Sequence, residues 1–129
     1  MNPVLRFIEA TNRHDLDGIE AAVHPDFEMI VPQHPIRGFK GREQELRNME
    51  HLITTHPDCH IEVLRMVETE SEVWIENHLT ASNLEMAAAV IFGIDQETDT
   101  ILWGRYYSDP VERGGPGADE WLRQLDSTP

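Results

Sequence analysis

The first half of the chain carries apolar residues at helical spacing. After Pro3, apolar side chains recur every three or four residues, which predicts an amphipathic helix that ends near Asn12. Asp15 is a suitable N-cap for a second helix, and Pro25 prevents that helix from continuing. A third helix is predicted to begin near Arg42 and to end at His56-Pro57. Its apolar stripe consists of Leu46, Met49, Leu52 and Ile53.

Alternating positions predict one strand before the third helix and four strands after it. Phe27, Met29 and Val31 alternate with other residues in a short strand that stops at Pro32. After Pro57 the period of the apolar residues changes from about 3.6 to about 2. The segments with this period are residues 60–68, 73–81, 86–94 and 101–108. Only short polar stretches separate them, so consecutive strands are expected to pair antiparallel.

This order of elements predicts an α+β fold in which helices cover one face of a strongly bent antiparallel sheet. The 129 residues suffice for one hydrophobic core. We assign residues 1–112 to a single domain and residues 113–129 to a Gly/Pro link with a C-terminal helix. That helix is expected to dock through Trp121 and Leu122.

Alternation also assigns the two faces of the sheet. The residues predicted to face the helices are Val73, Ile75, Asn77 and Leu79, then Met86, Ala88, Val90 and Phe92, and finally Leu102, Gly104, Tyr106 and Ser108. Because Ala88 and Gly104 are small, the helices can leave an interior pocket there. The alternative is a filled core in which Phe7, Phe27 and Met49 occupy that room.

The opposite face gathers large aromatic side chains on neighbouring strands. This outer patch consists of Trp74, His78, Trp103, Arg105 and Tyr107. It exceeds what a monomer usually exposes, so we predict a homodimer that forms through this face. The alternatives are scattered surface aromatics or a patch covered by the C-terminal helix.

Composition and net charge exclude several classes of partner and cofactor. Ten Lys and Arg against 24 Asp and Glu give a net charge of −14, which opposes binding to nucleic acid and to anionic membranes. Without a signal pattern or an apolar run long enough to span a bilayer, we expect a cytoplasmic protein. The single cysteine excludes an intrachain disulfide. The residues His51, His56, Cys59 and His60 lack paired ligand spacing, so we expect neither a metal nor a cofactor.

Two segments resemble a known superfamily. Residues 7–19 (FIEATNRHDLDGI), followed by His24-Pro25-Asp26, resemble the opening of the nuclear transport factor 2-like superfamily, and residues 101–110 (ILWGRYYSDP) resemble its last strand. The superfamily includes ketosteroid isomerase, limonene epoxide hydrolase and the SnoaL-like polyketide cyclases. The resemblance covers about residues 3–112. It implies a cone-shaped α+β fold with the helices packed on the concave face of the sheet, an interior pocket and frequent dimers.

The catalytic positions of these enzymes carry unsuitable side chains here. The phenol, base and acid positions of ketosteroid isomerase fall on Phe7, Val31 and Val90, all of which are apolar. The positions of the epoxide hydrolase triad fall on Tyr106, Asn77 and Leu79. Both mechanisms are therefore predicted to be absent. No catalytic residue of the cyclases can be matched, so cyclisation is neither supported nor excluded.

The remaining polar candidates are few. Asn77 and Tyr106 can orient a ligand oxygen, or they can bond to each other and only stiffen the core. His34 at the pocket mouth is a candidate base, and Asp109 is a candidate acid or a turn cap. The predicted ligand-binding residues are Phe7, Met29, Val31, Met49, Ile75, Asn77, Leu79, Ala88, Val90, Phe92, Gly104 and Tyr106.

Three functions remain open from the sequence. The first is a small-molecule-binding protein with a mostly apolar pocket for a hydrophobic ligand. The second is an isomerase, cyclase or hydrolase that acts on a polyketide-like or terpenoid-like substrate. The third is a non-catalytic dimerising module.

Overall fold

The computed structural model describes residues 1–127 of the chain, which form four α-helices and six strands. The helices are α1 (Pro3–Asn12), α2 (Leu16–Ala22), α3 (Arg42–Thr55) and α4 (Ala118–Asp126). The strands are β1 (Val23–Ile30), β2 (Phe39–Lys40), β3 (His60–Glu68), β4 (Glu72–Ala81), β5 (Leu84–Asp95) and β6 (Thr100–Pro110). A short 3-10 helix, Pro35–Arg37, leads into β2.

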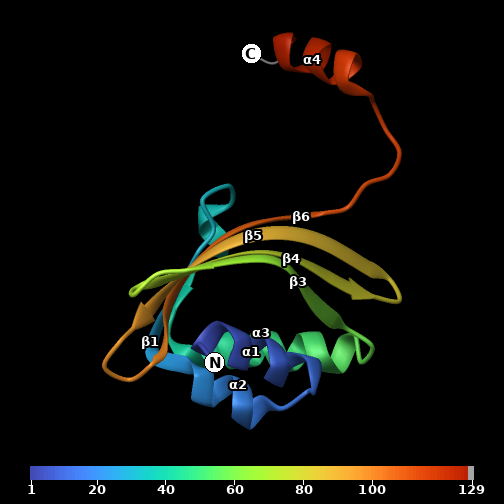
Figure 1. Cartoon of the computed structure of the whole chain (residues 1–129). Coiled ribbons are helices and arrows are strands. Elements are labelled where there is room, and N and C mark those ends of the chain that lie inside the picture. The colour runs from blue at the N-terminus through green and yellow to red at the C-terminus, as the bar shows by residue number, and fades with distance from the viewer. Residues whose placement is uncertain (128–129) are drawn as a thin grey trace.

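The strands form one sheet that curves over helices α1 to α3 (Figure 1). The strand order is β2-β1-β6-β5-β4-β3, and the pairings are antiparallel except that between β1 and β6. The predicted fold class, α+β with a bent sheet and helices on its concave face, is confirmed. The sheet is mixed because β1 enters beside β6 after a long connection and not through a hairpin.

Local side-chain bonds fix where the helices begin. The Asn2 side chain accepts a hydrogen bond of 2.9 Å from the Leu5 backbone N–H, and Asp15 accepts one of 3.0 Å from Gly18. Gly41 caps α3 with a φ of 102°, in the region that favours glycine. Its N–H donates to the Phe27 carbonyl at 2.7 Å, which ties the start of α3 to β1.

The core lies between the helices and the concave face of the sheet. Its buried side chains include Val4 and Ile8 from α1, Ile19 from α2, and alternate residues of β4 and β5. Along β4 and β5 the residues predicted to face the helices do so. Near the start of β6 the alternation of inward and outward residues shifts by one position. A bulge opposite Gly93 and Ile94 buries Ile101, at 1% exposure, and leaves Leu102 half-buried.

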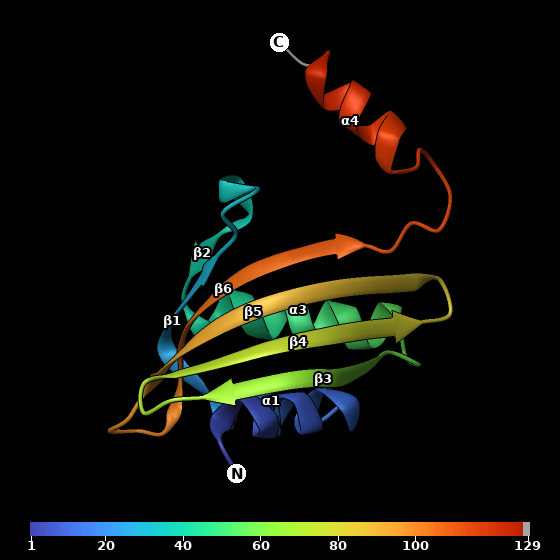
Figure 2. The same ribbon diagram turned by 45° about the horizontal axis from the view of Figure 1, so that its top comes forward.

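Helix α4 stands away from the sheet, at the end of an arm that continues β6 (Figures 1 and 2). The prediction that this helix docks on its own domain through Trp121 and Leu122 is wrong, because these side chains are 53% and 54% exposed. A Cβ atom added at Gly114, Gly115 or Gly117 would have no other atom within 4 Å, so the arm is not packed against the domain at these positions. Among residues 1–127, no helix combines the length and apolar character needed to cross a bilayer.

Candidate functional site

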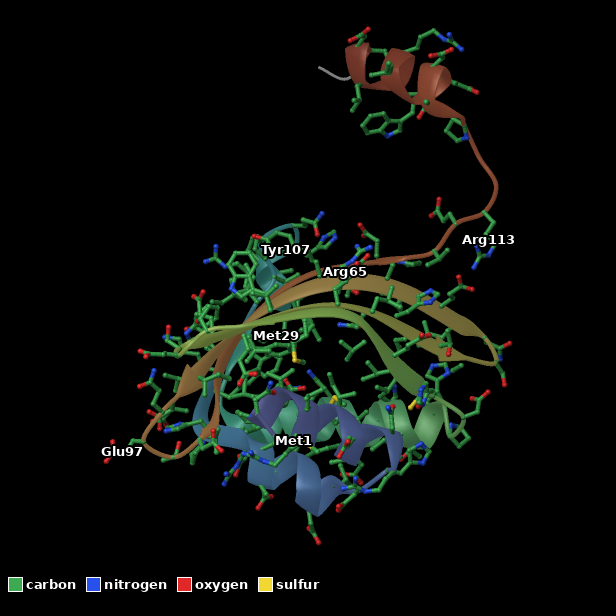
Figure 3. All side chains as sticks on the ribbon, in the orientation of Figure 1. Met1, Met29, Arg65, Glu97, Tyr107 and Arg113 are labelled. Carbon is green, nitrogen blue, oxygen red and sulfur yellow. The ribbon has the colours of Figure 1, made fainter. Side chains whose placement is uncertain are left out.

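A hollow of about 300 Å³ opens between the concave face of the sheet and helices α1 and α3. We call it the inner hollow. Its lining residues are Phe7, Ile8, Met29, Glu45, Asn48, Met49, Leu52, Ile61, Ile75, Asn77, Leu79, Met86, Ala88, Val90, Phe92, Tyr106 and Ser108. Figure 3 shows Met29 beneath the sheet, between the strands and the helices. Most of the lining is therefore apolar, and polar side chains interrupt it at a few points only.

The inner hollow gathers most of the residues predicted to bind a ligand. Those it brings together are Phe7, Met29, Met49, Ile75, Asn77, Leu79, Ala88, Val90, Phe92 and Tyr106. Val31 lies instead in a shallow groove beside β2, because β1 ends at Ile30 and the chain turns outward. Gly104 lies beneath the Tyr106 ring, where a Cβ atom would be 2.6 Å from Cε1 of that ring.

Two predicted catalytic residues lie away from the inner hollow. His34 is exposed just before the 3-10 helix, so its predicted place at the pocket mouth is corrected. Asp109 is exposed and pairs with Ala87 on the outer face, while its neighbour Ser108 faces inward. Strand alternation causes this difference, because successive side chains point to opposite faces. Neither residue is part of the lining of the inner hollow.

The predicted hydrogen bond between Asn77 and Tyr106 does not form. Asn77 lies level with Ala88 of β5 and with Ser108 of β6, which is two strand spacings or about 10 Å away, and Tyr106 lies two residues further along β6. The Tyr106 ring leans back over Gly104 and meets Phe92 edge to face, with ring centroids 5.7 Å apart. Both polar groups are thus left to face the hollow separately.

Glu45 is the residue that sequence reasoning missed. It is buried, with 5% exposure, and among the described residues its Oε2 atom has no hydrogen-bond partner. A signal was present in the sequence, because Glu45 precedes Met49 by four residues and Leu52 by seven and so belongs to the apolar stripe of α3. The first turns of a helix tolerate carboxylates well, which makes such a residue look like an ordinary surface charge.

Burial changes the acid chemistry of the hollow. Loss of hydration raises the pKa of Glu45 from 4.5 to about 7. The N-terminal end of α3 favours the carboxylate, but this modest effect is smaller than the cost of dehydration. Burial, and then the charge of Glu45, raise the pKa of Tyr106 well above its usual value of 10.0. At neutral pH Tyr106 therefore stays a neutral phenol, whereas Glu45 exchanges its proton readily.

Potential metal ligands do not gather in the described part of the chain. Within residues 1–127, no group of three His, Cys, Asp or Glu side chains is placed to hold a metal ion. Cys59 is buried, with its Sγ atom 4.0 Å from Nε2 of His14, and burial raises the pKa of this thiol. The polar chemistry of the inner hollow is thus that of one carboxyl group, one phenol, amides and a hydroxyl.

The fold and the sequence both identify the family. The model of the SnoaL-like domain matches residues 4–101, so the chain belongs to the SnoaL-like domain family. The predicted membership of the nuclear transport factor 2-like superfamily is confirmed. No curated protein matches the chain significantly.

Solved structures share the architecture at low sequence identity. A SnoaL-like protein of unknown function from Burkholderia thailandensis is 22% identical, with a TM-score of 0.67 over 81% of this chain and 89% of its own. An LEH-like epoxide hydrolase from M. tuberculosis is 18% identical, with a TM-score of 0.69 over 83% and 80%. A ketosteroid isomerase-like protein from Kribbella flavida is 16% identical, with a TM-score of 0.71 over 89% and 81%. At these identities the likeness establishes the fold and leaves the chemistry to the residues themselves.

The pKa of Glu45 makes the stability of the fold depend on pH. The folded state holds the Glu45 proton up to about pH 7, whereas the unfolded chain releases it near 4.5. Stability from this group is therefore fully present below pH 4.5, falls as the pH rises to about 7, and is then lower by about 3 kcal/mol. Glu45→Gln removes this penalty, so at pH 8 the variant is expected to unfold at higher urea concentration than the wild type.

The comparison is made by urea unfolding at pH 5 and pH 8. The gain from Glu45→Gln should be larger at pH 8, and Glu43→Gln, which changes an exposed carboxylate on the same helix, should show no such difference. Equal gains from Glu45→Gln at both pH values would show that this carboxyl titrates normally.

Proposed function

We propose that this protein binds a hydrophobic small molecule in the inner hollow. The observation that carries the proposal is the hollow itself, which is lined mainly by apolar side chains and touched by a few polar groups. Such a combination is typical of small-molecule sites, where apolar surface supplies affinity and isolated polar groups fix orientation. Apolar walls are poorly hydrated, so few hydrogen bonds to water are lost when a ligand replaces the water next to them.

The hollow exists because small side chains occupy the middle of a curved sheet. Ala88 lies between Asn77 and Ser108 on the neighbouring strands, so its short side chain leaves the space above it open. The helices cannot close over this point without losing their packing on the flanking strands. A ligand that fills this space contacts β4, β5 and β6 together.

The polar groups of the hollow favour a ligand with few polar atoms. Tyr106 offers a phenol that stays neutral at physiological pH, and Asn77 and Ser108 offer an amide and a hydroxyl at a separate point. A ligand with one or two hydrogen-bonding groups and a largely hydrocarbon body satisfies these residues without leaving its own polar atoms unpaired.

An acid–base enzyme is the second candidate, and Glu45 is the observation that favours it. A carboxyl group with a pKa of about 7 both accepts and donates protons at neutral pH. Its presence weakens the sequence argument that apolar replacements at Phe7 and Val90 leave nothing to move a proton. Isomerisation, cyclisation or hydrolysis of a hydrophobic substrate then becomes a function that this hollow can support.

The enzyme candidate predicts proton exchange on a ketone. With 2-tetralone in deuterated buffer, Glu45 would take a proton from the carbon beside the carbonyl, while Tyr106 donates a hydrogen bond to the oxygen that gains the electron pair. Proton NMR should then show exchange faster than in buffer alone, lost in Glu45→Gln and slowed in Tyr106→Phe. Exchange that is unchanged in both variants would exclude these residues from catalysis.

The binding function is tested by filling the hollow. Ala88→Leu places a larger side chain in the open space and should abolish the thermal stabilisation that geraniol or 2-phenylethanol gives to the wild type. Ala21→Leu introduces the same side chain at an exposed position of α2, outside the lining of the hollow, and should leave that stabilisation intact. Differential scanning fluorimetry measures both.

Two results would contradict the proposal. One is the absence of stabilisation of the wild type by any member of a library of hydrophobic alcohols, ketones and amines. The other is stabilisation that persists in Ala88→Leu, which would place the ligand elsewhere.

A further inference from the structure

The inner hollow contains an acidic group without a basic counterpart. Its lining residues include no Lys, Arg or His, and the titratable side chains among them are Glu45 and Tyr106. Oε2 of Glu45 lacks a hydrogen-bond partner within residues 1–127. A buried carboxylate is normally paired with a cation or hydrogen-bonded, because isolation in an apolar site is costly. A ligand can supply the cation or hydrogen-bond donor that Glu45 lacks.

Aromatic rings surround the same space. Phe7 from α1, Phe92 from β5 and Tyr106 from β6 all line the hollow. Aromatic faces attract cations, most strongly where water is excluded. The chain also carries a net charge of −14, which raises the local concentration of cations and disfavours anionic ligands.

We propose that the inner hollow binds a hydrophobic amine, whose ammonium group pairs with the Glu45 carboxylate while its hydrocarbon body fills the apolar space. The inference rests on the proposed binding function and adds the chemical class of the ligand. The amine supplies the donors that Oε2 lacks, and its charge replaces the counter-ion that the protein does not provide. The aromatic rings contact the ammonium group and the adjacent carbon atoms.

The pH dependence of binding distinguishes an amine from a neutral ligand. An ammonium ion pairs with the Glu45 carboxylate, so below about pH 7 binding requires that Glu45 release its proton. Affinity for an amine therefore rises from pH 5 to pH 7 and then levels off. A carbonyl ligand accepts a hydrogen bond from protonated Glu45, so its affinity stays nearly level up to about pH 7 and falls above it.

No other titrating group in the hollow obscures this effect. Residues from α1, β1, β3, β4 and β5 add no titratable side chain to the lining. On β6, Tyr106 stays neutral because its pKa lies well above 10.0. Primary alkylamines, like lysine, remain protonated throughout the range.

The experiment compares 2-phenylethylamine with 2-phenylethanol, which share one hydrocarbon body. Isothermal titration calorimetry at pH 8 should show the amine binding about tenfold or more tightly than the alcohol. Glu45→Gln should remove this preference and keep the affinity for the alcohol, whereas Glu43→Gln on the exposed side of α3 should keep both. Amine affinity of the wild type should fall by about tenfold per pH unit below pH 7.

The outcomes separate the two proposals. Binding of the alcohol with equal or weaker binding of the amine would overturn the amine inference and leave the hydrophobic site standing. An amine preference that survives Glu45→Gln would also overturn it, because another group would then hold the ammonium ion. Binding of neither molecule would overturn the amine inference, and the hydrophobic site is overturned as well if the library of alcohols, ketones and amines also fails to stabilise the wild type.

A second observation concerns the outer face of the sheet and helix α4. The outer face exposes Leu64, Val67, Trp74 and Tyr107 at 51%, 62%, 48% and 38%. Figure 3 shows Tyr107 on the side of the sheet away from α1 and α2, which is also the side of α4. Hollows of about 350 and about 540 Å³ open on this face, next to Trp74, Tyr107 and Leu64.

Helix α4 presents a matching apolar face. Trp121, Leu122 and Leu125 lie at helical spacing and are each about half exposed, and no residue of α4 is buried. The arm before α4 is held to β5, since the Val111 N–H donates to the Glu85 carbonyl at 2.9 Å and Arg113 pairs with the Glu85 carboxylate. This attachment carries α4 beyond the end of the sheet (Figure 2).

Charge supports contact between these two surfaces. Helix α4 carries three acidic residues, Asp119, Glu120 and Asp126, against Arg123 alone. The outer face supplies Arg105, which lies level with Trp74 across Ile91, whereas Arg65 is already paired with Glu76 on the same face, 3.1 Å away, and adds no net charge. Because each chain carries −14, copies repel one another unless acidic groups meet basic ones. An acidic amphipathic helix on the arginine-bearing apolar face satisfies this condition.

We infer that α4 of one copy packs on the outer face of a second copy, and that the exchange is reciprocal in a two-fold dimer. The predicted dimer through Trp74, His78, Trp103, Arg105 and Tyr107 thereby gains a helix that covers part of each face. Of these residues, the half-buried Trp103 contributes least to the interface between copies, because its indole already packs on Gly93. A Cβ atom added at Gly93 would be 1.9 Å from Nε1 of that indole.

Sedimentation velocity of the full chain tests the exchange. The wild type should sediment as a dimer, and Trp74→Glu and Trp121→Glu should each give monomers. An equimolar mixture of the two variants should recover dimer, because one intact α4 then meets one intact outer face. Ala21→Glu is the control, since Ala21 is exposed on α2, which lies on the opposite side of the sheet from the outer face and from α4 (Figure 1).

A monomeric wild type would overturn the exchange and favour α4 folding onto its own sheet. A dimer that resists Trp121→Glu would overturn the role of α4. The absence of recovery in the mixture would overturn the exchange between copies.

Discussion

The chemistry of the inner hollow depends on the burial of one carboxyl group against an apolar sheet. Glu45 lies on the face of α3 that packs toward the core, and it contributes an acid to a hollow whose other lining residues are mostly hydrocarbon. Dehydration opposes ionisation there, and no basic side chain of the lining compensates for it. The group therefore changes charge near neutral pH. The proposed ligand class, the proposed acid–base capacity and the predicted pH dependence of stability all follow from this balance.

The backbone places the acid and the phenol on opposite walls of the same space. Gly41 begins α3 with a positive φ and bonds to Phe27 of β1, so α3 starts at a fixed point over the sheet. Gly104 lets the Tyr106 ring lie close to β6 and against Phe92. Larger side chains at these positions would strain the helix start or displace the ring. The geometry of the hollow thus depends on two glycines, which have no functional side chain of their own.

Much of the fold was predictable because hydrophobic periodicity is a local signal. The change of period after Pro57 separates the helical part from the four long strands, and alternation assigns Ile75 and Trp74 to opposite faces. The bulge near Gly93 and the short strand β2 were not predictable in this way, because both depend on pairing between distant segments. The position of α4 depends on its surroundings and not on its own clear helical pattern.

The site was predictable only in part, because burial of a polar residue is a tertiary property. The walls from β4 and β5 follow from alternation, and Tyr106 follows from the same rule. Glu45 has the spacing of a core residue, but its chemical type suggested a solvated helix surface. Val31 and His34 were misplaced because the end of β1 turns outward at Ile30. An acidic residue within an apolar stripe is therefore a useful sequence signal for a buried functional group.

The most direct measurement is the titration of the Glu45 carboxyl carbon by NMR in protein labelled with ¹³C-glutamate, with Glu45→Gln to assign the resonance. The account predicts a midpoint near pH 7 in the free protein, shifted to lower pH when 2-phenylethylamine is bound. A midpoint near the ordinary glutamate value of about 4.3 in the free protein would contradict it.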